Sequence, residues 1–209
     1  MSSSQLIPIH VWVDPRCPWA WITSQWLLEL ERVRSVTVQF HIMSLSVLNE
    51  NREIPEKYRE AQVEGWGAVR VCVAAAEKYG DAVLRPLYLA MGARIHLNRA
   101  GLGPEMIRAS LRDADLPEDI VDAASDTAYD GALRASHHRG MDPVGQDLGT
   151  PVIHATSLTG DPIAFFGPVL TTIPRAETAG RLWDGVLAVT STEGFTELKR
   201  NRDQDPNFT

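Results

Sequence analysis

The alternation of apolar and polar residues at the start of the chain predicts a strand, a long helix and a second strand. Residues 7–13 are rich in β-branched side chains, and residues 35–43 place apolar side chains at every second position. Between them, apolar residues recur at helical spacing from Trp21 to Val33. Two strands joined by a helix normally pair in parallel through a right-handed crossover, so we expect a βαβ unit.

Helical patterns replace strand patterns over the middle of the chain, from Pro55 to about Gly140. Glycine and proline divide this region, because both residues interrupt helices. We expect helices at residues 55–79, 81–97, 104–114, 117–124 and 126–139. The region shows no fixed period, which argues against a repeat array.

The strand pattern returns after the helical region. Residues 149–154 and 162–166 flank a polar turn around Gly160, so we expect a β-hairpin. Pro174 then begins an amphipathic helix that runs to about Thr190. The order βαβ, helices, ββα predicts an α/β fold with an all-helical insertion.

This order also predicts the domain organisation. One discontinuous α/β domain comprises residues 1–45 and 145–200, and the helical insertion comprises residues 46–144. Residues 201–209 are polar, and we expect them to form a mobile tail.

Composition and charge narrow the classes of partner. The chain has 209 residues, 44% of them hydrophobic, which is enough for a globular core. Its formal net charge of −7 argues against a nucleic acid or an anionic membrane as partner. No apolar run reaches the roughly 18 residues that span a bilayer, and the first residues lack the pattern of a secretory signal. We therefore expect a cytoplasmic protein, as a monomer or a homodimer, without a membrane or nucleic-acid partner.

The strongest candidate for chemistry is Cys17, which falls where the first strand passes into the helix. Proline is best tolerated in the first turn of a helix, so Pro18 predicts that Cys17 is the N-cap residue. A thiol at that position faces free backbone N–H groups and the positive end of the helix dipole, and both favour the thiolate. We therefore predict that Cys17 is a nucleophile.

For the other candidate residues, the sequence context favours structural roles over catalytic ones. Cys72 lies in an apolar helical stretch and is expected to be a core residue, with a redox role as the alternative. His137 and His138 point about 100° apart on a helix, so we expect surface histidines and no metal site. Asp14 is expected to shape the turn after the first strand. The sequence has neither a G-x-G-x-x-G motif nor a P-loop, which argues against a tightly bound nucleotide.

Several short motifs occur in an order that is specific when they are taken together. They are Asp14-Pro15-Arg16-Cys17-Pro18-Trp19-Ala20-Trp21, Gly149-Thr150-Pro151 and Phe165-Phe166-Gly167-Pro168. With the helical insertion between them, they resemble the DsbA-like thioredoxin superfamily, in particular its actinobacterial mycothiol-dependent reductase (nitroreductase) branch. The resemblance implies a thioredoxin-like fold and a thiol-dependent oxidoreductase.

The resemblance also implies roles for particular residues. Cys17 would be the attacking cysteine, Pro18 part of its catalytic motif, and Pro151 a cis-proline beside it. Thr150 would offer backbone groups to an extended thiol or peptide. Mycothiol or a similar low-molecular-weight thiol would be the co-substrate, a small-molecule or protein disulfide the substrate, and no cofactor would be tightly bound.

The chain departs from the family pattern at Ala20, where a Cys-x-x-Cys motif has its second cysteine. Alanine cannot resolve a mixed disulfide, so either the natural protein is a monothiol enzyme or Ala20 replaces a resolving cysteine. A monothiol enzyme requires an external thiol that releases Cys17 by exchange.

Residues near the thiol motif are candidates for the substrate side. We expect Trp19 to face the ligand and Trp21 to pack in the core, because Trp21 begins the apolar stripe of the helix. Asn49 and Tyr58 follow the second strand, whose end should open near the thiol, and are candidates for a substrate groove. Loop capping and helix packing are the alternative roles for these two residues.

Three functions fit these observations. The first is a thiol–disulfide oxidoreductase that forms a mixed disulfide through Cys17. The second is a transferase or isomerase that uses a bound thiol cofactor, as in the similar kappa-class glutathione transferases, with Cys17 holding or activating that thiol. The third is a catalytically idle thioredoxin-like domain that binds peptides beside Pro151, and its motivation is Ala20.

Overall fold

The computed structural model describes residues 6–56 and 59–208, and within them a four-stranded mixed sheet forms the centre of the α/β fold. Its strands are β1 (Ile7–Val13), β2 (Val36–Ile42), β3 (Val152–Thr156) and β4 (Pro162–Phe166), in the order β2-β1-β3-β4. β1 and β2 are parallel, and β3 pairs antiparallel with both β1 and β4. The predicted βαβ unit and hairpin are therefore confirmed.

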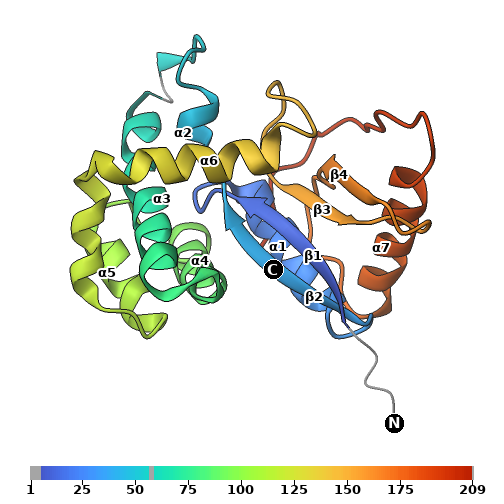
Figure 1. Cartoon of the computed structure of the whole chain (residues 1–209), viewed down its shortest axis with the longest axis horizontal. Coiled ribbons are helices and arrows are strands. Elements are labelled where there is room, and N and C mark those ends of the chain that lie inside the picture. Colours follow the sequence, from blue (N-terminus) through green and yellow to red (C-terminus); the bar gives the residue numbers. More distant parts are fainter. Residues whose placement is uncertain (1–5, 57–58, 209) are drawn as a thin grey trace.

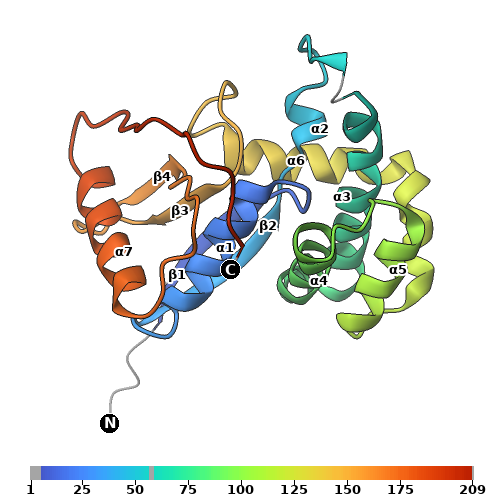
Figure 2. The ribbon, with the colours of Figure 1, turned by 180° about the vertical axis from the view of Figure 1, so that it is seen from behind.

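One face of the sheet is covered by α1 (Pro18–Leu30) and α7 (Glu177–Thr190), as Figures 1 and 2 show. Successive side chains of a strand point to opposite faces, and alternate residues of β1 are buried beneath these helices. They are Ile9, Val11 and Val13. The indole N–H of Trp26 donates to the carbonyl oxygen of Ala179 at 3.0 Å and joins the two helices.

The last helix begins later than the sequence indicated. α7 starts at Glu177, so the expectation that Pro174 begins it is wrong. The reason is Ala176, whose φ of 48° lies in the left-handed region and cannot continue a right-handed helix.

The opposite face of the sheet carries Trp12 and is covered at one end by α6 (Asp130–Met141). The Trp12 indole N–H donates to the carbonyl oxygen of Ser136 at 2.9 Å. A side chain at Gly140 would overlap the indole ring, so glycine permits this close approach. The indole and α6 therefore fix the position of β1 from this side.

The remaining helices gather at one end of the sheet in both views of the ribbon (Figures 1 and 2). They are α2 (Leu45–Leu48), α3 (Arg59–Tyr79), α4 (Leu84–Gly92) and α5 (Pro104–Asp113), with α6 crossing from them to the sheet. Arg70 of α3 donates to both carboxylate oxygens of Asp130 at 2.6 and 3.0 Å, which joins α3 to the start of α6. No helix in the described part of the chain is long and apolar enough to cross a lipid bilayer.

The predicted helix at residues 81–97 is divided in the structure. A 3₁₀ turn at Asp81–Val83 precedes α4, and a π-helical turn at Ala93–Leu97 follows it. Pro86 explains the later start of α4, because proline lacks an N–H and is tolerated only in the first turn of a helix.

The structure also differs from the prediction for the helices at residues 117–124 and 126–139. The first is a 3₁₀ segment at Glu118–Ser125, and α6 begins only at Asp130. The carboxylate of Asp126 accepts a hydrogen bond from the Ala128 N–H at 2.9 Å, a local bond that holds a turn before α6.

We predict that Gly140→Ala destabilises the fold and that Gly131→Ala in the same helix does not. A Cβ at residue 140 would overlap the buried Trp12 ring, whereas a Cβ at residue 131 meets nothing within 4 Å. Overpacking of this kind costs about 1–3 kcal/mol. Urea unfolding of the two variants measures the difference, and equal free energies of unfolding would contradict the packing of α6 on Trp12.

Candidate thiol active site

Cys17 occupies the N-cap of α1, as the sequence predicted. Its backbone is extended, with φ −80° and ψ 114°, and Pro18 is the first helical residue. The Ala20 N–H donates to Cys17 Sγ at 3.5 Å, and the Trp21 N–H donates to the Cys17 carbonyl oxygen at 3.0 Å. The thiol is therefore held against the first turn of the helix.

The segment before β3 supplies the other side of the site. The peptide bond between Thr150 and Pro151 is cis, and the Cys17 thiol lies 3.6 Å from the carbonyl oxygen of Thr150. The Thr150 hydroxyl donates to the carbonyl oxygen of Trp12 at 2.8 Å, and the Gly167 N–H donates to that of Pro151 at 2.9 Å. Residues far apart in the sequence thus meet around one sulfur.

Burial raises the pKa of the Cys17 thiol to about 11, against 9.0 for an ordinary thiol. The Ala20 N–H lowers this pKa, the charge of Asp14 raises it, and the Trp19 N–H and the charge of Arg16 lower it. The expectation that the helix start favours the thiolate holds for the sign of the N–H effect, but burial reverses the net direction of the pKa shift. The N–H groups act in the predicted direction, but removal from water has the larger effect, because Cys17 is only 6% exposed.

Asp14 and Arg16 hold the loop that presents Cys17. The Asp14 carboxylate, 1% exposed, accepts hydrogen bonds from the Arg16 N–H at 3.0 Å and from the Leu45 N–H at 2.8 Å. The Arg16 guanidinium pairs with Asp14 at 3.4 Å and donates to Ser46 Oγ at 3.0 Å. A side chain at Gly65 would overlap this guanidinium. Asp14 therefore shapes the turn, as predicted, and also ties it to the helices after β2.

Trp19 and Trp21 have different surroundings. Trp21 is 4% exposed, and its ring lies against Tyr88 and His96, which confirms its predicted place in the core. Trp19 is half-buried, and the guanidinium of Arg202 lies 4.5 Å from the centre of its ring. The C-terminal segment therefore covers part of the ring that was expected to face a ligand.

The residues predicted as a mobile tail do not lie free of the protein. The rings of Phe208 and His96 are 5.5 Å apart, and the Asn207 N–H donates to the carbonyl oxygen of Thr171 at 2.8 Å. Figure 2 shows this segment crossing in front of α1. Sequence reasoning missed the contact, although an aromatic residue in an otherwise polar stretch was a signal for it.

Comparison with known proteins assigns the chain to a family. Residues 16–200 match the model of the Rv2466c-like family, described as mycothiol-dependent nitroreductase Rv2466c. The chain belongs to this family. A curated relative, the uncharacterized protein Rv2286c of Mycobacterium tuberculosis, is 28% identical over 190 residues, which are 90% of this chain and 79% of that protein.

Solved structures share the fold. The cytosolic disulfide reductase DsbM from Pseudomonas aeruginosa, also solved with GSH, is 17% identical with a TM-score of 0.55, over 86% of this chain and 98% of that chain. The oxidoreductase DsbA from Xylella fastidiosa is 15% identical with a TM-score of 0.52, over 88% and 86%. A 2-hydroxychromene-2-carboxylate isomerase is 10% identical with a TM-score of 0.55, over 86% and 93%. The DsbA-like thioredoxin fold is confirmed, and the family makes this protein a thiol-dependent oxidoreductase.

Of the two predicted groove residues, the structure describes Asn49. The Asn49 side-chain amide donates to the carbonyl oxygen of Leu45 at 2.9 Å, so it caps the short helix α2. Its role in a substrate groove stays a prediction. Tyr58 lies outside the described residues.

Cys72 is a core residue in this member of the Rv2466c-like family. It is fully buried, its Sγ lies 3.8 Å from Met91 Sδ, and both cysteines are free thiols. Burial raises the pKa of the Cys72 thiol well above its usual range. The predicted structural role is therefore supported by its position.

The paired histidines differ from each other. His137 is 1% exposed, so the expectation of two surface histidines is wrong for this residue. Its ring nitrogen accepts a hydrogen bond from the Ser44 N–H at 3.4 Å, whereas the exposed His138 pairs with Asp142 at 3.0 Å. Within the described residues, no group of histidine, cysteine and acidic side chains is arranged to hold a metal ion.

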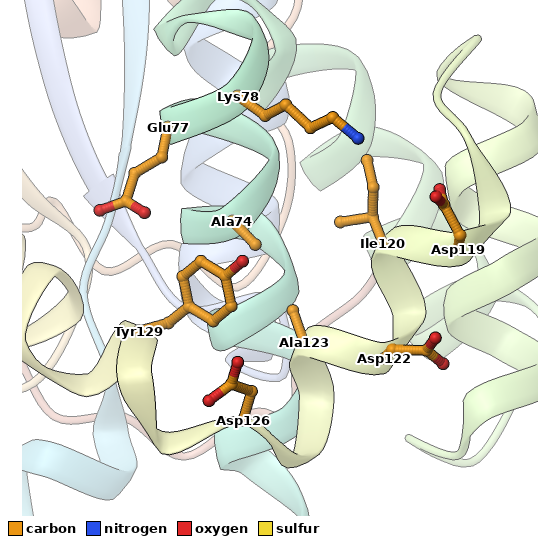
Figure 3. A pocket seen from close by; sticks show the side chains of 9 residues that line it. All are labelled: Ala74, Glu77, Lys78, Asp119, Ile120, Asp122, Ala123, Asp126 and Tyr129. Carbon is orange, nitrogen blue, oxygen red and sulfur yellow. The ribbon is translucent and has the colours of Figure 1, made fainter.

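A cavity of about 470 Å³ lies away from the thiol, between α3 and the 3₁₀ segment at Glu118–Ser125 (Figure 3). Acidic side chains line much of it, including Asp119, Asp122 and Asp126. In Figure 3 the Lys78 side chain extends toward Ile120 and Asp119. None of the residues that line the cavity is a cysteine, and none belongs to the loop or helix turn around Cys17.

We predict that alkylation of Cys17 by iodoacetamide accelerates with rising pH to a midpoint near 11, because only the thiolate reacts and burial raises the pKa to about 11. At pH 7 the thiolate would be on the order of one molecule in 10,000. Mass spectrometry of the digested protein separates Cys17 from Cys72. A midpoint below 9 would show that the helix start outweighs burial.

We also predict that Asp14→Asn lowers this pH midpoint and that Arg16→Met raises it. The Asp14 charge raises the pKa of the Cys17 thiol, and the Arg16 charge lowers it. The same alkylation assay measures both shifts. Asp119→Asn, in the distant cavity, is the matched control and should leave the midpoint unchanged. Shifts of the same sign in both loop variants would refute this electrostatic account.

Proposed function

We propose that this protein is a monothiol thiol–disulfide oxidoreductase in which Cys17 forms a mixed disulfide with mycothiol or a similar small thiol. The observation that carries the proposal is the position of Cys17 Sγ, at the N-cap of α1 and 3.6 Å from the carbonyl oxygen preceding Pro151. Membership of a mycothiol-dependent family supports the identity of the thiol.

The proposed cycle consists of two exchange reactions. The Cys17 thiolate attacks one sulfur of a disulfide RS–SR′, so that a bond forms from Cys17 Sγ to RS and the RS–SR′ bond breaks. The leaving thiolate R′S⁻ takes a proton. A small thiol, as its thiolate, then attacks RS and restores Cys17. The incoming thiol leaves as a disulfide with RS and has thereby been oxidised. The R′S group has been reduced to the thiol R′SH.

Ala20 explains why the second thiol comes from outside. Its backbone N–H is the donor to Cys17 Sγ at 3.5 Å, so the family's usual second cysteine would stand beside the sulfur. Cys72 offers no replacement, because it is fully buried against Met91. Reduction by an internal dithiol is therefore not part of the proposal, and the substrate is a small-molecule or protein disulfide.

Residues on both sides of the sulfur take part in the proposed site. Pro18 fixes the first turn of the helix behind Cys17, and the backbone of Thr150 and Pro151 lies along the substrate side. The indole of Trp19 would contact the group attached to the disulfide once Arg202 moves from its ring. We place this reaction in the cytoplasm, in keeping with two free thiols in the chain.

The second candidate is a transferase or isomerase in which Cys17 only holds a cofactor thiol. The raised pKa of the buried Cys17 thiol favours it, since a protonated thiol can donate a hydrogen bond to another sulfur without attacking it. The isomerase with a similar fold is the structural parallel. A mixed disulfide on Cys17 separates the two candidates, because only the oxidoreductase forms one.

We predict that oxidised mycothiol adds one mycothiol to Cys17, detected by intact-mass and peptide mass spectrometry. Cys72→Ala should retain the adduct and Cys17→Ser should lose it. Ala20→Cys should convert the adduct within the assay into a disulfide between residues 17 and 20, because the new thiol stands beside the sulfur.

The controls separate the alternatives. Reduced mycothiol should release the adduct from the native protein. No adduct at a pH where Cys17 is alkylated would contradict the oxidoreductase. Isomerisation of a chromene-type substrate without an adduct would favour the second candidate.

A further inference from the structure

We propose that residues 201–208 form a strap that closes over the thiol site and controls access of disulfides to Cys17. This inference rests on the proposed function of Cys17 and adds a control of access to it. The strap lies beyond residues 16–200, the part of the chain that matches the family.

The strap contacts the chain on both sides of Cys17. The guanidinium of Arg202 lies 4.5 Å from the ring centre of Trp19, two residues after the thiol. The ring of Phe208 lies 5.5 Å from that of His96, whose Nε2 is 2.9 Å from the carbonyl oxygen of Pro15, two residues before the thiol. The two ends of the strap therefore bracket the loop and helix turn that present the sulfur.

A third attachment holds the strap on α1. The Asn207 N–H donates to the carbonyl oxygen of Thr171 at 2.8 Å. The segment that contains Thr171 is itself tied to α1, because the Thr23 hydroxyl donates to the carbonyl oxygen of Pro168 at 2.8 Å. Phe208 packs on the hydrophobic core that includes Cys17. Figure 2 shows the resulting path across the front of α1.

These attachments are of a kind that opens without unfolding the domain. The strap has neither helix nor strand among residues 201–208, and Arg202 is exposed to solvent. A cation–π pair at an exposed position is weak, and segments with few buried contacts open locally. The reaction needs such an opening, because Cys17 is 6% exposed and a disulfide must reach its sulfur in line.

Arg202 links substrate binding at Trp19 to the movement of the strap. Its guanidinium occupies the face of Trp19, so a substrate that stacks on this ring has to displace it. Access to Cys17 and binding at Trp19 are then coupled, since one movement exposes both. Loss of a tail that only stabilised the fold would raise the reactivity of Cys17 and Cys72 together, whereas loss of the strap should act on Cys17 alone.

The test compares the alkylation rate of Cys17 at one pH in four proteins. They are the full chain, a form that ends at Arg200, the double variant Arg202→Ala/Phe208→Ala, and Leu198→Ala. Leu198 is the matched control, because it precedes the strap and is 78% exposed. Iodoacetamide serves as the small reagent and a fluorescein maleimide as the bulky one, with Cys72 in the same digest as the reference for global loosening.

We expect the shortened form and the double variant to react about two- to fivefold faster than the full chain, the range that corresponds to the loss of an exposed cation–π contact. The gain should be larger for the bulky reagent, and Leu198→Ala should react like the full chain. Equal rates in all four proteins would overturn the strap, as would a parallel rise at Cys72. The double variant keeps the test valid if the shortened form does not fold.

A second measurement distinguishes failure of the strap from failure of the proposed function. The same proteins are exposed to oxidised mycothiol, and the adduct at Cys17 is measured. Faster alkylation without any adduct would support the strap and contradict the proposed mixed disulfide with mycothiol. An adduct with unchanged alkylation rates would support the proposed mixed disulfide and contradict the strap.

Discussion

The antiparallel pairing of β1 with β3 is the interaction on which the site depends. Val11 stands opposite Ile153 and Trp12 opposite Val152, so the residues before β3 come to the end of β1 where α1 begins. The Thr150 hydroxyl closes this junction by donating to the carbonyl oxygen of Trp12. One register thus determines which carbonyl faces Cys17. The side chains that fix β1, Trp12 on one face and the buried Val11 and Val13 on the other, are therefore part of the functional design as well as of the core.

The protonation state of Cys17 depends on a balance between the effect of its helix position and the effect of burial. The N-cap position offers backbone N–H groups that favour a thiolate, but the surroundings remove the sulfur from water and favour the thiol. An enzyme that attacks disulfides gains from a thiol that stays protonated until a substrate arrives, since the unoccupied site then resists oxidation. The proposed strap fits this balance, because its opening restores water to the thiol motif as it admits the substrate.

Much of the fold could be predicted from the order of its elements. The alternation in β1 and β2, the helical spacing after Cys17 and the turn around Gly160 are local signals, and each reflects a periodicity that sequence carries directly. The errors arose where backbone conformation depends on single residues. Pro86 delays α4, and Ala176 prevents α7 from starting at Pro174. His137 is buried although its neighbour is exposed, because α6 turns that one side chain toward Ser44.

The sequence by itself determined that Cys17 is an N-cap residue and that no second thiol follows it in the motif, because both depend on neighbouring residues: Cys17 before Pro18, and Ala20 three positions on. Only the tertiary structure decided what surrounds the sulfur. The Thr150 carbonyl lies beside the sulfur, the buried Asp14 accepts from Leu45, and Arg202 and Phe208 contact Trp19 and His96 near it, all through contacts between distant parts of the chain. Burial and solvation are properties of the packed molecule, so the direction of the thiol pKa shift could not be read from the motif.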